Sequence, residues 1–267
     1  MTSFATPISA FMTSPVMSIP ETASLAAAHQ LLRDRSVSCL AVTRDDRPAG
    51  VISRTDLLRA GRFAARARDG GSASRAPLLT FPDDKKVGDV MRRDIIALPP
   101  EATVSAAART LMEHRIHRVF VRDGDRLRGV FSTKDLLLAI REKRIGAPIA
   151  EAMSTPVFTV PVGATLALAT DRLDKAHISG LCVVDEDAFP VGTFTQTEAM
   201  TARDLPADTP VEEVMSYAML CVDVRTPLFR AAGYAHATRA RRVLAVEGRR
   251  LAGVVTGLDF ARVAAAG

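Results

Sequence analysis

The chain has 267 residues, of which 48% are apolar and 24% charged, a balance that fits a folded globular protein and excludes an intrinsically disordered one. No run approaches the roughly 18 apolar residues that a transmembrane helix needs, and the N-terminus lacks the basic and apolar regions of a secretory signal. Three widely spaced cysteines, with no C-x-x-C among them, predict neither a disulfide framework nor a zinc site. We therefore expect a cytoplasmic protein.

The net charge of +5 is unevenly distributed along the chain. Residues 1–148 hold 24 Lys and Arg against 16 Asp and Glu, an excess of 8 positive charges, whereas residues 149–267 hold 11 against 14, an excess of 3 negative charges. An anionic ligand is therefore expected in the first half, although an Arg-rich solvated surface explains the same numbers.

Four segments of the chain repeat one pattern, and we name them copies one to four: 8–60, 87–141, 149–201 and 211–264. With the residues that lead into it, copy one is predicted to form a repeat domain of residues 1–60. Each copy opens with a short apolar stretch that ends in Met: Met12, Met91, Met153 and Met215. A Gly follows each Met by 38 or 39 residues, and an acidic residue follows that Gly by six: Asp56, Asp135, Glu198 and Asp259.

Within each copy the same order of elements is predicted. A short strand, such as residues 157–160, precedes a helix whose apolar residues recur at i, i+3, i+4 and i+7. The N-cap candidates at or beside the starts of these first helices are Ser24, Thr103, Thr165 and Thr226. Two short strands follow, and the second helices are expected to begin at Arg54, Thr133, Gln196 and Gly257. The unit is therefore β-α-β-β-α, and because its core alone is marginal, two units are expected to pair.

Residues 61–86 separate copies one and two and form a linker or insert outside the repeat. Its first part is predicted to extend the preceding helix, and residues 70–74 are predicted to be a flexible loop. The arginines of the insert offer charge to phosphates, but a solvated loop is the simpler interpretation. What remains outside the four copies is too short for a catalytic domain.

The repeated motifs resemble those of the CBS domain (cystathionine β-synthase domain), and the resemblance covers the whole chain. They are the M-[TSR] opening, the x-V-x-x-V-P strand, I-H-R-V-F-V at 116–121, and G-V-I-S-R-T-D-L-L and G-V-F-S-T-K-D-L-L at the second helices. The resemblance implies an α/β (α+β) fold in which copies one and two form one Bateman module and copies three and four form another. It also implies a non-catalytic regulatory protein and a homodimer, because CBS modules bind adenosine-containing ligands, act on other proteins and often form disc-like dimers.

The second helices begin with S-x-x-D in copies one and two and with T-x-x-D in copy four. The free N–H groups and the positive dipole end of a helix N-terminus attract an anion. The resemblance places the hydroxyl on phosphate and the carboxylate on ribose, which gives three predicted pairs: Ser53 with Asp56, Ser132 with Asp135, and Thr256 with Asp259. Thr55 and Lys134 are predicted to add to these sites. The same spacing is also a capping box, which stabilises a helix by about 0.5–2 kcal/mol without any ligand.

Copy two carries His117-Arg118 at the start of a predicted strand. A similar pair contacts phosphate in the γ subunit of AMP-activated protein kinase, and Arg suits that role because its planar fork bonds two oxygens at once. A surface His and Arg explain the pair equally. Copy four has Arg241-Arg242 at this place, whereas copies one and three lack the charge. Because Glu198 replaces the usual Asp in copy three, the second module is predicted to be degenerate and to serve dimerisation or partner contact.

These features predict a regulatory protein that binds AMP, ADP, ATP or S-adenosylmethionine, mainly in the first module, and modulates an unidentified partner protein. No cofactor is required, and the histidines show no metal-ligand spacing. A ligand-free scaffold for oligomerisation is the main alternative. A nucleic-acid binder is less favoured, because the chain has no Trp and only two Tyr for stacking, and an enzyme is the least favoured. Cys182, on a predicted core strand, is expected to be a small buried hydrophobe.

Overall fold

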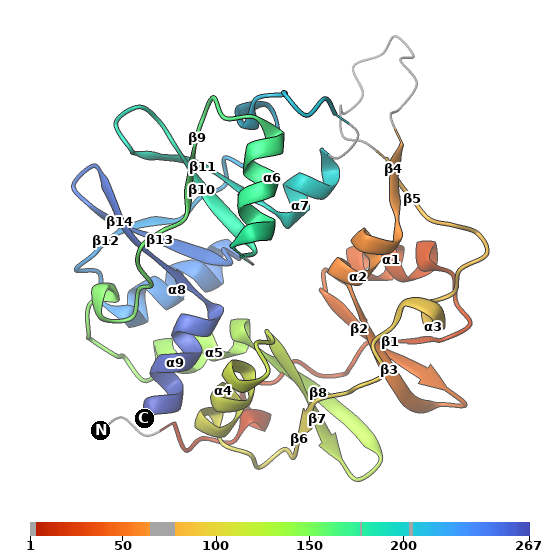
Figure 1. Ribbon diagram of the computed structural model, residues 1–267. Coiled ribbons are helices and arrows are strands. Elements are labelled where there is room, and N and C mark those ends of the chain that lie inside the picture. Colours follow the sequence, from red (N-terminus) through yellow and green to blue (C-terminus); the bar gives the residue numbers. More distant parts are fainter. Residues whose placement is uncertain (1–3, 65–77, 177, 203–204) are drawn as a thin grey trace. The chain divides into compact units, whose positions relative to one another are not determined.

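A computed structural model describes residues 4–64, 78–176, 178–202 and 205–267 (Figure 1). It contains four β-α-β-β-α units, as the repeats predict. Copy one comprises β1 (Ser18–Pro20), α1 (Leu25–Asp34), β2 (Cys39–Arg44), β3 (Arg47–Ser53) and α2 (Arg54–Ala60). Copy two comprises β6 (Ala97–Leu98), α4 (Val104–Glu113), β7 (Arg118–Asp123), β8 (Arg126–Ser132) and α5 (Thr133–Glu142).

The other two copies follow the same order. Copy three comprises β9 (Thr159–Pro161), α6 (Leu166–Lys175), β10 (Gly180–Val184), β11 (Pro190–Thr195) and α7 (Gln196–Thr201). Copy four comprises β12 (Cys221–Asp223), α8 (Leu228–Thr238), β13 (Arg242–Glu247), β14 (Arg250–Thr256) and α9 (Gly257–Ala266). A short helical turn opens each copy: η1 (Ile8–Ala10), α3 (Val87–Val90), η2 (Ile149–Glu151) and η3 (Val211–Glu213).

Each copy forms a three-stranded mixed sheet whose middle strand runs parallel to the first strand and antiparallel to the last. All four second helices begin at the predicted residues. Ser24, Thr103 and Thr165 are confirmed as N-caps, since each side chain accepts a hydrogen bond from a backbone N–H three residues on. In copy four the N-cap position belongs to Pro227, so Thr226 lies one residue outside the helix.

The predicted extension of α2 into the insert is wrong. The helix ends at Ala60, because Gly61 adopts an extended conformation, and Arg62–Ala64 then forms β4. Strand β4 pairs in antiparallel fashion with β5 (Leu78–Thr80). Residues 70–74, predicted as a flexible loop, and Arg66, Arg68 and Arg75 lie outside the described residues.

The chain divides into two compact units. Unit 1 comprises Met1–Pro15, Ile96–Thr195 and Asp208–Gly267, which include the bodies of copies two and four and the sheet and first helix of copy three. Unit 2 comprises Val16–Ile95 and Gln196–Ala207, which include the body of copy one and α7. Within unit 2, α7 packs against α2.

The opening segment of each copy packs against the other copy of its pair, not against the body that follows it. Backbone N–H groups of these segments donate to carbonyl oxygens of the paired copy: Ile8 to Ala102 (2.8 Å), Val87 to Ala23 (2.9 Å), Ile149 to Thr226 (2.8 Å) and Val211 to Ala164 (2.8 Å). The exchange links copy one with copy two and copy three with copy four, in the pairs that the resemblance implies.

The exchanged segments explain why Met and Gly recur in every copy. Each Met lies directly against the Gly of the paired copy, where a Cβ would come within 2.4–2.8 Å of the Met sulfur: Met12 on Gly129, Met91 on Gly50, Met153 on Gly253 and Met215 on Gly192. At Gly50 a Cβ would also come within 2.5 Å of the backbone oxygen of Arg92, so a larger residue there would force the opening segment away from the sheet. The repeated Gly is therefore a packing requirement of the exchange.

In unit 1, copies two and four share a core through their helices (Figure 1). Helix α5 packs against α8 and α9, and α4 packs against α9. The core includes Phe131, Leu136 and Phe260, together with Phe4 and Ile8 of the opening segment. The repeat pattern gives no indication of this contact between copies two and four.

Copies three and four pack sheet against sheet. Cys182 and Val184 on β10 cluster with Leu244 on β13, the middle strand of the other sheet. Cys182 is 4% exposed, and burial raises the pKa of its thiol to about 12, which confirms that it behaves as a small hydrophobe.

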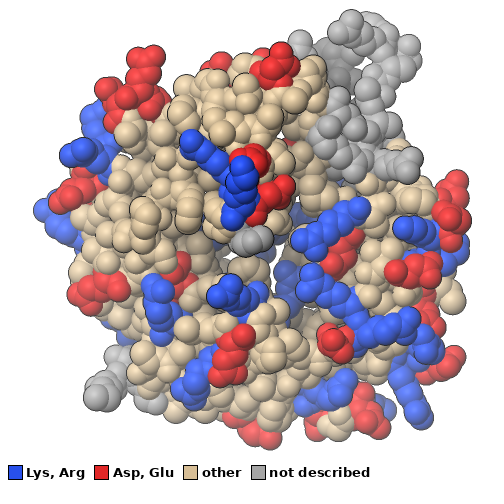
Figure 2. Space-filling view, viewed as in Figure 1, with Lys and Arg blue, Asp and Glu red and all other residues tan. Residues whose placement is uncertain are grey.

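The surface carries charges of both signs. On the face shown in Figure 2, Lys and Arg side chains alternate with Asp and Glu and do not gather into one basic patch. Such a face gives no support to a nucleic-acid surface. In the part of the chain that the structure describes, no helix has the length and apolar character to cross a membrane.

Candidate functional site

The three predicted Ser/Thr–Asp pairs are capping boxes at the starts of α2, α5 and α9. In copy two, the backbone N–H and the hydroxyl of Ser132 both donate to Asp135 Oδ2, each at 2.7 Å. Thr256 makes the same two bonds to Asp259 Oδ2 at 2.8 and 2.7 Å, and Ser53 makes them to Asp56 Oδ2 at 2.9 and 2.5 Å. The three carboxylates are only 6–8% exposed. The capping role of these residues is therefore established by geometry.

The second oxygen of each carboxylate faces an exchanged opening segment. Asp135 Oδ1 accepts from Thr13 Oγ1 (3.3 Å), Asp259 Oδ1 accepts from Ser154 Oγ (2.7 Å), and Asp56 Oδ1 accepts from Arg92 Nε (3.4 Å). Each donor is the residue that follows the Met of the M-[TSR] motif. The M-[TSR] motif is visible in the sequence as part of the resemblance. Nothing in the sequence indicates that the residue after Met contacts the capping Asp of the paired copy.

In copy three the arrangement differs. Ser216, which follows Met215, accepts a hydrogen bond at its Oγ from the backbone N–H of Ala218 (3.3 Å). The acidic residue of copy three, Glu198, lies on the six-residue helix α7 in unit 2. The departure at Glu198 therefore coincides with a departure in the residue after the Met.

The helix starts of copies two and four lie in direct contact. A Cβ on Gly257, the first residue of α9, would come within 2.7 Å of Thr133 Cβ at the start of α5. The backbone N–H of Thr133 donates to the carbonyl of His117 (3.0 Å), and Arg242 is the register partner of Thr256. The strand starts of the two copies thus lie around the same pair of helix N-termini.

Basic side chains gather at this contact: His117, Arg118 and Lys134 from copy two, and Arg239, Arg241 and Arg242 from copy four. Partial burial and then the charges of Arg118 and Arg241 lower the pKa of His117. Partial burial and then Arg241 and Arg239 lower the pKa of Lys134. Like charges held close together raise the free energy of the protonated forms, so this region is electrostatically prepared for an anion.

Arg242 also connects copy four to copy three. Its Nη2 donates to Ser179 Oγ (2.7 Å). The guanidinium packs directly on Gly180, where an added Cβ would lie only 2.7 Å from Nη2. Ser179-Gly180 is the counterpart of His117-Arg118 in the repeat. The strand start of copy three thus lacks a charge of its own and receives one from its neighbour.

The ten predicted site residues fall into both units. Unit 2 holds Ser53, Thr55 and Asp56, with Thr55 half-buried in the first turn of α2. Unit 1 holds the other seven, five from copy two and two from copy four, and brings the two groups together: His117, Arg118, Ser132, Lys134, Asp135, Thr256 and Asp259. The sequence identified these residues singly, whereas their meeting across copies two and four becomes visible only in the fold.

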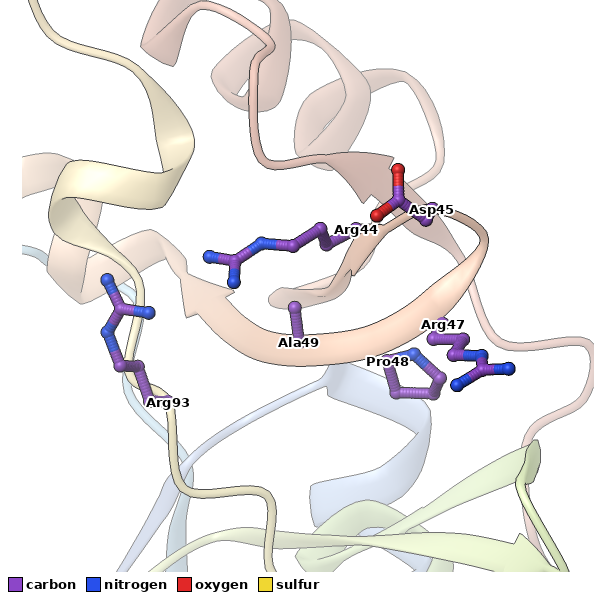
Figure 3. A pocket seen from close by; sticks show the side chains of 6 residues that line it. All are labelled: Arg44, Asp45, Arg47, Pro48, Ala49 and Arg93. Carbon is purple, nitrogen blue, oxygen red and sulfur yellow. The ribbon is translucent and has the colours of Figure 1, made fainter.

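Unit 2 also has a cavity of about 500 Å³ at the β2–β3 hairpin (Figure 3). In that view the guanidinium groups of Arg44 and Arg93 lie on the same side, whereas Arg47 points away from them. Arg44 holds Glu21 through its Nε and Nη2 at 2.5 and 2.7 Å, and this bond, with the charge of Arg93, lowers the pKa of Glu21. The protein's own carboxylate therefore already partners Arg44, and we assign no ligand there.

The fold and site define a class of protein built from tandem repeats. At the contacts between copies, these repeats place capped helix N-termini beside basic side chains from the starts of the strands. The family model of the CBS domain matches residues 8–62, 87–142 and 149–204, which is more than half of the chain. The chain belongs to the CBS domain family. The structure adds copy four, which the family model does not match.

The curated relatives match the chain over part of its length. An uncharacterised 33.4 kDa protein from the ribosomal RNA operon of Thermofilum pendens is 24% identical over 64% of this chain and 56% of its own length. A second relative, protein MJ1404 of Methanocaldococcus jannaschii, is covered over only 34% of its length. The chain thus spans about half or less of the length of these two relatives.

Some solved structures resemble the chain almost end to end. Among them, protein MJ1225 of Methanocaldococcus jannaschii has a TM-score of 0.74 at 15% identity over 96% of this chain and 99% of that one. This similarity shows the fold with four CBS repeats. A shorter structure, CBSX2 in complex with AMP, matches 45% of the chain at 22% identity with a TM-score of 0.41.

Proposed function

We propose that this chain is a non-catalytic regulatory protein that binds an adenine nucleotide and modulates a partner protein. The observation that carries the proposal is the cluster of five Lys and Arg side chains, with His117, around the abutting helix starts of copies two and four, beside Asp135 and Asp259. Phosphates would meet Arg118, Lys134 and the helix N–H groups, and ribose would meet the carboxylate.

The electrostatics favour a phosphorylated ligand over S-adenosylmethionine. The pKa of Lys134 is lowered partly by Arg241 and Arg239, so an added negative charge relieves repulsion within the cluster. The sulfonium of S-adenosylmethionine would add a positive charge to the same region. AMP, ADP and ATP are therefore the preferred candidates, and Ser53, Thr55 and Asp56 of copy one remain a second proposed site.

A ligand-free scaffold is the second candidate, and one observation favours it. Each of the three carboxylates already accepts hydrogen bonds from its cap and from an opening segment, and is at least 92% buried. A structural role accounts for these bonds without a nucleotide. The two functions differ in whether any adenosine ligand stabilises the protein.

Thermal unfolding of the full chain with AMP, ADP, ATP, GTP, NAD and S-adenosylmethionine separates the two. A ligand at about 100 times its Kd adds about 2.7 kcal/mol, which corresponds to a Tm shift of about 5–10 °C for a chain of this size. We expect AMP, ADP or ATP to give such a shift and S-adenosylmethionine to give less. No shift with any compound would leave the scaffold as the function.

Nucleotide affinity is expected to depend on pH through His117. Its pKa is below the ordinary value of 6.5 in the free protein, and a bound phosphate would raise it, so binding takes up a proton. Affinity should therefore increase as the pH falls through the interval between the free and bound pKa values, by at most about tenfold per pH unit. Isothermal titration with ATP at several pH values measures this slope.

The control for this effect is a second histidine of the same copy. His117→Gln should flatten the pH dependence, whereas His114→Gln, at the exposed end of α4, should leave it unchanged. An unaltered slope in His117→Gln would place the phosphate elsewhere. The stability of the free protein changes with pH in the opposite direction to the affinity. Because the pKa of His117 is lower in the folded than in the unfolded chain, the free energy of unfolding falls as the pH drops below about 6.5.

A further inference from the structure

One carboxylate in each of three copies holds two parts of the chain at once. In copy two, Oδ2 of Asp135 accepts from the cap residue Ser132, while Oδ1 accepts from Thr13 of the exchanged opening segment. Thr13 also forms a two-way backbone bridge with Val130, with N···O distances of 2.9 and 3.0 Å. The opening segment is thus fastened to copy two at its backbone and at the buried acid.

We propose that the ribose of a bound nucleotide and Thr13 compete for Oδ1 of Asp135, so that ligand binding in copy two releases the opening segment. This inference rests on the proposed function. Asp135 is 7% exposed, so two ribose hydroxyls reach its carboxylate only if a present donor gives way. The donor that gives way is Thr13, because the bonds from Ser132 are 0.6 Å shorter (2.7 against 3.3 Å) and belong to the helix cap.

Copy two is better suited to this release than copy four. Asp259 Oδ1 accepts from both Ser154 Oγ at 2.7 Å and Arg262 Nη2 at 3.1 Å, and the second bond is charge-assisted. Asp135 Oδ1 has the single, longer bond from Thr13. Burial raises the pKa of Asp135, in agreement with a carboxylate whose charge is incompletely compensated.

The release would act on the connection between the two units. Thr13 lies two residues before Pro15, where the chain leaves unit 1, and Val16 begins unit 2. Loosening Thr13 therefore changes how the chain is held at the point where it passes from one unit to the other.

Thr13→Val in the full chain tests the competition. The substitution keeps the shape of the side chain but removes the donor, so a nucleotide no longer has to displace it. We expect the affinity for ATP, measured by calorimetry, to increase about 3- to 10-fold, the value of one ordinary hydrogen bond. The matched control is Ser216→Ala, the corresponding residue of copy four's opening segment, whose Oγ accepts from the backbone of Ala218 and which should leave affinity unchanged.

Hydrogen exchange gives a second readout that a purely structural role would not produce. In the unchanged protein, ATP should accelerate exchange at the amides of Thr13 and Val130 while slowing it around α5. If ATP binds but Thr13→Val leaves affinity unchanged or lowers it, or the two amides become more protected, the competition is wrong and the proposed function stands. If no adenine nucleotide binds either protein, the competition and the proposed function both fail.

Discussion

Replacing Ile8 by Ala is expected to destabilise copy two by about 2–5 kcal/mol, although Ile8 belongs to the opening segment of copy one. Ile8 is fully buried and packs in the core that copies two and four share, and its backbone N–H donates to Ala102. Removing its side chain leaves a cavity in that core. Denaturant unfolding of the full chain measures the loss.

Leu25→Ala is the matched comparison, because Leu25 is 1% exposed in the core of copy one. Hydrogen exchange should show that Ile8→Ala loosens residues 97–142, whereas Leu25→Ala loosens residues 16–60. If Ile8→Ala loosened copy one and left copy two protected, the exchange of opening segments would be wrong.

Asp135→Asn is expected to lower the affinity for ATP about 10- to 100-fold while costing only about 0.5–2 kcal/mol of stability. The substitution removes the negative charge that would bind the ribose hydroxyls and weakens the capping box that Ser132 completes. Calorimetry with ATP and denaturant unfolding of the same variant give the two quantities.

Asp89→Asn supplies the control for capping alone. Asp89 closes an exposed capping box, accepting from the backbone N–H of Lys86 at 2.8 Å, and is not part of the proposed site. It should cost stability without changing affinity. Equal and small effects of Asp135→Asn on affinity and stability would remove the ribose assignment and leave Asp135 as a cap.

The features that depend on neighbouring residues could be predicted from the sequence. The helices that begin at Arg54, Thr133 and Gly257 follow from S/T-x-x-D, because a capping box joins residues only three apart. The four-fold repeat gave the order of the elements in the same way. Contacts between residues close in sequence are thus sufficient to predict the β-α-β-β-α unit and the Ser/Thr–Asp pairs.

The features that join distant segments could not be predicted. Thr13 and Asp135 are 122 residues apart, and Ser154 and Asp259 are 105 apart, so no local pattern connects them. An apolar opening segment reads the same whether it packs on its own copy or on its pair. The contact of Gly257 with Thr133 is not predictable for the same reason, because it joins residues of two different copies.

The exchanged opening segments also govern the order in which a nascent chain can complete its parts. Phe4 and Ile8 are made about 100 residues before the backbone they bond to, at Ser105 and Ala102. At about 5–20 residues per second, two side chains destined for a core stay uncovered for about 5–20 s. The opening of copy three waits in the same way for Asp259 in α9, about 100 residues later. Synthesis of α9, and not of each repeat in turn, therefore completes these contacts of unit 1.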